Sequence, residues 1–160
     1  MKRPPIYTVT ANGYRDQLDR TRRFLERVEA NSAQSEVHYQ DDVWCFFQNC
    51  LNLYDWIQNE LRLSDATKAK IRADVDSVPC LKICYDIANG TKHYKLKTGK
   101  VGARHSHTDT RITPGEDTLV DCFIELEDGT RLSARKIARE CVTEWEGILK
   151  SNNLPTGRLS

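Results

Sequence analysis

The chain has 160 residues, 29% of them charged, and a formal net charge of +1. This length predicts one domain with a core of its own, and the balanced charge gives no general reason to expect a nucleic-acid or membrane partner. The first residues, MKRPPIYTVT, contain no apolar run of signal-peptide length, and no later segment is long enough to cross a membrane. The composition therefore predicts a cytoplasmic protein with no membrane partner.

Helical periodicity dominates the first hundred or so residues. Apolar residues recur at helical spacing at about 14–30, 43–61 and 80–96, and the polar run at 31–42 separates the first two segments. The segment 43–61 has the broadest apolar face, so we expect a central helix that several neighbours cover. The sequence thus predicts three long helices.

Capping residues define the remaining helices. Ser64 is the expected N-cap of a short helix that reaches about Asp74, and Pro79 suits the first turn of the third long helix. Ser133 is the expected N-cap of a final amphipathic helix. Residues 151–160, which follow that helix, are predicted to be a tail.

The periodicity changes to alternation at 101–112 and 119–126, which predicts two strands. The sequences TPGED and EDGT contain turn-forming pairs, and a short third strand is predicted at 131–132. The predicted fold class is mainly α: a helical bundle of four to five helices with a small antiparallel β-hairpin inserted before the last helix. A sheet this small must pack on the bundle or on a partner.

The six cysteines are expected to be buried free thiols. Five lie along the apolar faces of predicted helices and one in a predicted strand: Cys45, Cys50, Cys80, Cys84 and Cys141, and Cys122. In a reducing compartment such residues behave as small apolar side chains. Cys80 and Cys84 are one helical turn apart rather than at the close spacing of a zinc ribbon. We therefore expect no metal and no cofactor.

A polar stripe on the third long helix is the candidate site. Lys82, Asp86, Asn89 and His93 follow one line along the helix, and Gly90 beside them suggests the close approach of another helix or a ligand. The ordinary alternative is a solvent-exposed face with a Lys82–Asp86 pair. Asparagine and histidine are indifferent helix formers, and histidine can accept and donate protons near neutral pH, which favours a functional stripe.

The helical layout and the sequence DIANGTKH late in a long helix resemble the HEPN superfamily, whose members are small helical bundles of bacterial toxin–antitoxin and phage-defence systems. Active members dimerise and cleave RNA without a metal. Their motif is an arginine, often followed directly by asparagine, and then a histidine, with four to six residues between the arginine and the histidine. Asn89 and His93 match this pattern, but Ala88 occupies the arginine position. The resemblance covers about residues 10–97, so that the chain, 1–160, is expected to be a single HEPN-like domain with a hairpin insertion at about 99–132.

The resemblance assigns roles to the stripe. His93 would be the acid–base residue, Asn89 a positioning residue and Asp86 a further catalytic side chain, with Lys82 and Lys92 as phosphate-binding residues. The arginine that would hold the phosphate is missing, so we expect a non-catalytic or degenerate module. We expect this module to form a homodimer and to contact RNA or a larger defence-system protein through a groove that the polar stripe lines. One alternative is a metal-independent endoribonuclease that uses His93. Another is an accessory or immunity subunit that docks on a larger effector.

Two further groups of residues are candidate sites. His105, His107 and Asp109 alternate along a predicted strand, so they are expected on one side of it, where they would suit a zinc or iron ion. An exposed strand face is the simpler interpretation. The first helix has five arginines interleaved with acidic residues, which favours a solvated face over a phosphate-binding one. These arginines are Arg15, Arg20, Arg22, Arg23 and Arg27.

Overall fold

The computed structural model describes residues 9–30, 35–94, 99–111, 114 and 119–159. These residues form five helices and one antiparallel sheet of three strands, so the prediction of a mainly α fold with a small sheet before the last helix is confirmed. The helices are α1 (Tyr14–Glu29), α2 (Glu36–Asn59), α3 (Asp65–Ser77), α4 (Pro79–His93) and α5 (Ala134–Ser151). The strands are β1 (Arg104–Arg111), β2 (Leu119–Glu125) and β3 (Arg131–Ser133).

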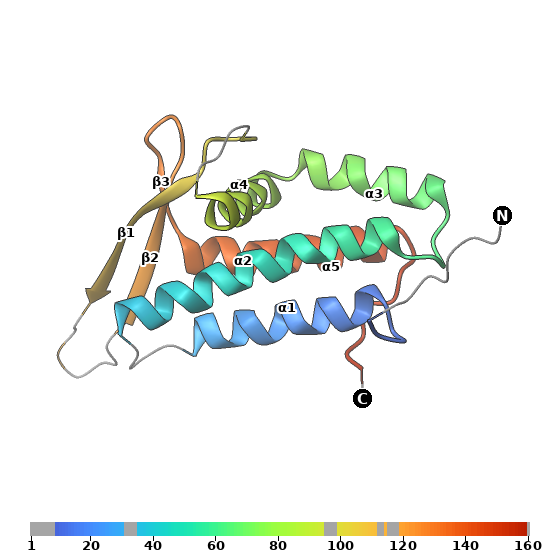
Figure 1. The fold of residues 1–160 in the computed structure, drawn as a ribbon, viewed down its shortest axis with the longest axis horizontal. Coiled ribbons are helices and arrows are strands. Elements are labelled where there is room, and N and C mark those ends of the chain that lie inside the picture. The colour runs from blue at the N-terminus through green and yellow to red at the C-terminus, as the bar shows by residue number, and fades with distance from the viewer. Residues whose placement is uncertain (1–8, 31–34, 95–98, 112–113, 115–118, 160) are drawn as a thin grey trace.

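Helix α2 is the centre of the bundle, as its broad apolar face predicted. It contacts α1, α4, α5 and the sheet, and α1 and α5 run lengthwise beside it (Figure 1). Helix α4 crosses this group and is seen nearly end-on in the same view, while the sheet lies at one end of the bundle. The buried face of α2 consists of Tyr39, Val43, Phe46, Phe47, Cys50, Leu53 and Ile57. This arrangement places the middle of α4 against the core.

The start of α2 and the end of α4 differ from the prediction. Helix α2 begins at Glu36, so the second half of the polar run belongs to the helix. The Ser35 side chain caps it by accepting the N–H of His38 at 3.3 Å, and Tyr39 is fully buried despite its polar neighbours. Helix α4 ends at His93, before the predicted end at 96, and residues 95–98 lie outside the described part of the chain.

The predicted caps of the other helices are confirmed. Ser64 accepts the N–H of Thr67 at 3.1 Å, and Ser133 accepts the N–H of Lys136 at 3.3 Å. Pro79 occupies the first turn of α4, where its missing N–H costs nothing. Helix α3 continues to Ser77, a little beyond the predicted end.

The sheet packs on the bundle. Its order is β1-β2-β3, and the alternate residues Val120, Cys122 and Ile124 of β2 are buried beneath it, on the side of α2 and α5. The turn between β2 and β3 has Gly129 at φ +84°, a conformation that favours glycine, and its N–H donates to the Leu126 carbonyl at 3.0 Å. The marginal three-stranded piece therefore obtains its apolar support from the helices.

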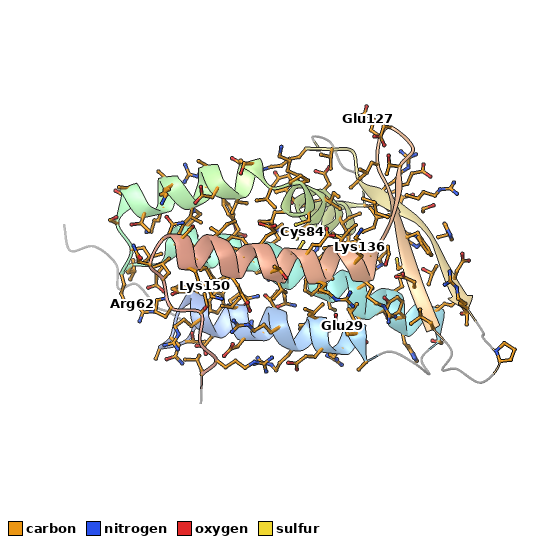
Figure 2. The ribbon with its side chains drawn as sticks, turned by 180° about the vertical axis from the view of Figure 1, so that it is seen from behind. Glu29, Arg62, Cys84, Glu127, Lys136 and Lys150 are labelled. Atoms are coloured by element: carbon orange, nitrogen blue, oxygen red, sulfur yellow. The ribbon has the colours of Figure 1, made fainter. Side chains whose placement is uncertain are left out.

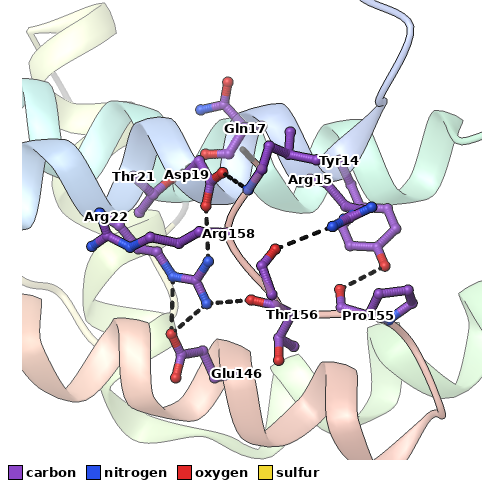
Figure 3. Close-up of polar contacts among 12 residues, drawn as sticks. Tyr14, Arg15, Gln17, Asp19, Thr21, Arg22, Glu146, Pro155, Thr156 and Arg158 are labelled. Atoms are coloured by element: carbon purple, nitrogen blue, oxygen red, sulfur yellow. Dashed lines mark hydrogen bonds and ion pairs between the residues drawn. The ribbon is translucent and has the colours of Figure 1, made fainter.

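The C-terminal residues are not a loose tail, which corrects the prediction. The Tyr14 hydroxyl donates to the Pro155 carbonyl at 2.9 Å, and Arg22 donates to the Thr156 carbonyl at 2.6 Å (Figure 3). Arg22 also pairs with Glu146 of α5 at 2.7 Å, and only 11% of its side chain is exposed. Arg22 therefore links α1 to α5 and to the C-terminal residues. At least this arginine is not part of the predicted solvated face.

Candidate functional site

The four residues of the predicted polar stripe on α4 do not share one environment. Asp86 is fully buried, Lys82 and Asn89 are partly buried, and His93 is exposed at the end of the helix. The four residues follow the expected line along α4, but other segments of the protein bury only part of that line. The stripe therefore divides into a covered middle and an open end.

Asp86 anchors the segment that leads from α4 to the sheet. Its carboxyl oxygens accept the backbone N–H groups of Lys100 at 2.6 Å, Val101 at 2.8 Å and Ala103 at 3.2 Å. Three backbone donors would otherwise lack a partner in this covered region, so the carboxyl group satisfies a structural need. The predicted catalytic side chain is thus placed where its oxygens are already occupied.

Ala88, at the position where the HEPN-like motif would have an arginine, lies against α2. Ala88 is fully buried, which leaves no space beside it for an arginine side chain. Gln48 of α2 hydrogen-bonds the Ala88 carbonyl and, at 2.8 Å, the Thr91 hydroxyl. Asn89 donates to the Tyr85 carbonyl one turn earlier at 2.8 Å. The two Gln48 contacts fix the last turns of α4 to α2, whereas the Asn89 contact stays within α4.

Gly90 does not mark a close approach, which corrects the prediction. A Cβ built at Gly90 would meet no heavy atom of the described residues within 4 Å. A different glycine has such a constraint: Gly102 has φ +64°, and a Cβ there would lie 2.9 Å from Glu127 Cβ. The close contact therefore lies in the segment that Asp86 anchors.

The open end of α4 consists of Lys92, His93 and Tyr94, which we call the α4 end. All three are exposed, and Tyr94, with 92% of its surface accessible, is the most exposed large apolar residue of the described chain. Tyr94 has φ +64°, in the left-handed region that a bulky residue seldom adopts. Lys92 places positive charge at the negative pole of the helix dipole, next to His93 in the last turn.

A charge pattern that the sequence interpretation missed surrounds this end. Residues 87–108 contain five lysines and arginines, three histidines and no acidic residue, although the whole chain carries only +1. Two of the five cations are neutralised in the fold, because Lys100 pairs with Asp76 and Arg104 pairs with Glu125. Within the described residues, Lys92 and His93 form no ion pair. Counting charge in a moving window would have found the segment.

The strand residues weighed as metal ligands are separated by a β-bulge, which corrects the expectation that they share a side. His105 lies opposite Ile124 and His107 opposite Phe123, so the ladder shifts by one residue between the two histidines. His107 stacks on the Phe123 ring at 4.8 Å and pairs with Asp109 at 3.1 Å. His105 instead forms a T-shaped pair with Trp44, with the ring centroids 5.3 Å apart, and burial lowers the pKa of His105. This trio does not form one ligand set.

A group of sulfurs gathers in the core instead. Five cysteines are buried as predicted and Cys45 is exposed, but the spacing did not reveal that three of them meet. The Sγ atoms of Cys50, Cys84 and Cys141, from α2, α4 and α5, all lie within 4.8 Å of one another. Figure 2 places Cys84 in the interior, where α4 meets α5. Pairwise spacing could not have found this group, because each sulfur comes from a different helix.

A cavity of about 180 Å³ adjoins two of these three cysteines. Its lining includes Cys50 and Cys84, the Trp145 indole, and the polar side chains of Tyr85 and Lys100. The Trp145 indole N–H is buried and has no hydrogen-bond partner among the described residues. The cavity thus has one sulfur-rich wall and one polar wall.

Comparison with known proteins yields no match to a family model, a curated protein or a solved structure. Within the described ranges, no helix combines the length and apolar character that crossing a bilayer requires. The function has to follow from the chemistry of the α4 end and the sulfur group.

Proposed function

We propose that the chain is a non-catalytic, HEPN-like binding module that contacts single-stranded RNA through the α4 end. The observation that carries the proposal is the division of the α4 stripe. The carboxyl group of Asp86 is occupied by three backbone N–H groups, whereas Lys92, His93 and Tyr94 are exposed. The exposed residues suited to contact are thus separate from the Asp86 carboxyl group, which the fold already uses.

The surroundings of His93 support binding rather than cleavage. Metal-free cleavage of RNA needs a group that moves protons and a fixed donor that stabilises the charge on the phosphate. Ala88 at the arginine position supplies no donor and is buried, and Asp86 is turned into the fold. Lys92 supplies one positive charge on a flexible stem, without the fork geometry of arginine. Among the residues that the structure describes, His93 therefore has no fixed donor beside it for the phosphate charge.

The composition of the α4 end suits RNA. A lysine and a histidine attract the phosphate backbone, and an exposed aromatic ring gives a surface on which a base can stack. An aromatic ring exposed to water does not stabilise the fold, yet 92% of the Tyr94 surface is accessible. A homodimer would present two such ends, which would raise the affinity through simultaneous binding.

The proposal is tested by fluorescence anisotropy with a labelled single-stranded RNA. Tyr94→Ala is expected to weaken binding about 5-fold to 100-fold, the usual effect of losing one base stack. Lys92→Ala should weaken binding and reduce its salt dependence by somewhat less than one unit of slope. Lys150→Ala is the matched control, because this exposed lysine lies at the far end of α5 (Figure 2).

Two outcomes would overturn the proposal. Equal binding by wild type, Tyr94→Ala and Lys92→Ala would remove the α4 end as the contact surface. Cleavage of RNA in EDTA by the wild type but not by His93→Ala would favour the ribonuclease alternative. Light scattering with and without RNA measures whether the binding species is a dimer.

A further inference from the structure

We propose that Cys50, Cys84 and Cys141 bind one zinc ion, with a water molecule from the adjoining cavity as the fourth ligand. The three sulfurs lie within 4.8 Å of one another on three helices that the core already holds together. Sulfurs on a tetrahedral zinc ion lie about 3.8 Å apart, because each Zn–S bond is about 2.3 Å long. The sulfurs therefore have to approach one another by about 1 Å at most, which small side-chain rotations provide.

Thiolate sulfur favours zinc over the hard cations. Calcium and magnesium prefer oxygen ligands, whereas zinc accepts sulfur and takes four ligands in a tetrahedron. In a zinc site with three protein ligands, the fourth position belongs to water or substrate. The cavity of about 180 Å³ reaches Cys50 and Cys84 and is large enough for such a water.

The groups around the sulfurs suit bound thiolates. Trp145 is 2% exposed, and its indole N–H has no partner in the described part of the chain, so it is available to donate to a thiolate. Cys84 donates to the Phe47 carbonyl at 3.5 Å and Cys141 donates to the Cys80 carbonyl at 3.4 Å. Both contacts are weak S–H hydrogen bonds. Zinc binding replaces these S–H bonds with Zn–S bonds and releases the thiol protons to solvent.

The cysteines outside the group act as controls. Cys122 is equally buried but lies in β2 rather than on one of the three helices that supply the sulfur group. Cys45 is exposed on α2. A general affinity of free thiols for metal would involve Cys45 first, whereas the proposed site excludes both Cys45 and Cys122.

The test uses the full chain, reduced and stripped of metal with a chelator. Cobalt(II) is added as the probe, because thiolate coordination produces an intense sulfur-to-cobalt absorption band and zinc then displaces the cobalt. We expect one equivalent of cobalt per chain, its release by one equivalent of zinc, and a melting temperature that rises with zinc concentration. The band should be lost in Cys84→Ser and unchanged in Cys45→Ser and Cys122→Ser.

The wild-type spectrum decides the proposal even where a variant does not fold. Absence of the charge-transfer band in folded wild type would overturn it, and so would a band that persists in folded Cys84→Ser. Circular dichroism establishes folding before each titration, and Cys84→Ala replaces Cys84→Ser if a buried hydroxyl unfolds the bundle. Proton release, measured by calorimetry in two buffers, should accompany zinc binding in wild type and be absent in the folded variant.

Discussion

The middle and the end of α4 have similar polar sequences but opposite environments. In the middle, Asp86 is buried and accepts three backbone N–H groups from the segment before β1. At the end, Lys92, His93 and Tyr94 are exposed. Both groups lie on one helix at regular spacing, and the difference arises because residues 100–103 cover Asp86 in the middle. Polar periodicity therefore indicates the side of a helix, but not what covers it.

Replacing Asp86 should have the largest effect on stability. In Asp86→Ala, three backbone donors lose their acceptor, and we expect a loss of about 3 to 4 kcal/mol in the free energy of unfolding. The matched control is Asp109→Ala, which removes an exposed carboxylate paired with His107 and should cost less than about 1 kcal/mol. Urea denaturation followed by circular dichroism measures both. Equal losses of stability would mean that the buried Asp86 stabilises the fold no more than the exposed Asp109 does.

Glu60 is a second buried carboxylate, and its contribution to stability should depend on pH. Side-chain hydrogen bonds from Arg62, at 2.9 and 3.0 Å, hold the pKa of this carboxyl below its usual value. A lowered folded-state pKa means that the stabilisation is complete above the unfolded value of about 4.3 and is lost as the pH falls through the folded-state value. Glu60→Gln should therefore cost about 1.5 to 2 kcal/mol at pH 7.

The cost of Glu60→Gln should shrink as the pH falls below about 4.3. Denaturant unfolding of the wild type and the variant at a series of pH values measures it. A cost that does not change with pH would contradict the role of the carboxylate charge.

Gly90 lies between the two regions and should respond in the opposite direction. A Cβ at this position meets no described heavy atom within 4 Å, and alanine favours a helix over glycine. Gly90→Ala is expected to raise the free energy of unfolding by about 0.5 to 1 kcal/mol. Thermal unfolding measures the change, and a destabilised variant would indicate that something does approach this face.

The α4 end should contribute least to stability. Tyr94→Ala removes a ring that is 92% exposed, and we expect a change within about 0.5 kcal/mol. The same variant is expected to lose RNA affinity, so the two measurements together separate contact from folding. A large loss of stability would place Tyr94 with Asp86 among the structural residues.

The sequence predicted most of the fold, because the patterns that specify it are local. Ser64 and Ser133 cap helices through contacts three residues away, and the apolar faces of α2 and α5 follow directly from their spacing. The bulge between His105 and His107 was not predictable from alternation, since one extra residue reverses the side of every later side chain. The fastening of the C-terminal residues by Arg22 likewise depends on a partner far along the chain.

The sequence by itself determined the class of fold, the helix caps, the central place of α2 and the polar line on α4. These follow from periodicity and from hydrogen bonds between near neighbours. Only the tertiary structure decided that Asp86 is covered while the α4 end is open, and that sulfurs from α2, α4 and α5 meet beside a cavity. The physical reason is that burial and clustering depend on which distant segments pack together, and the spacing within one helix carries no information about that.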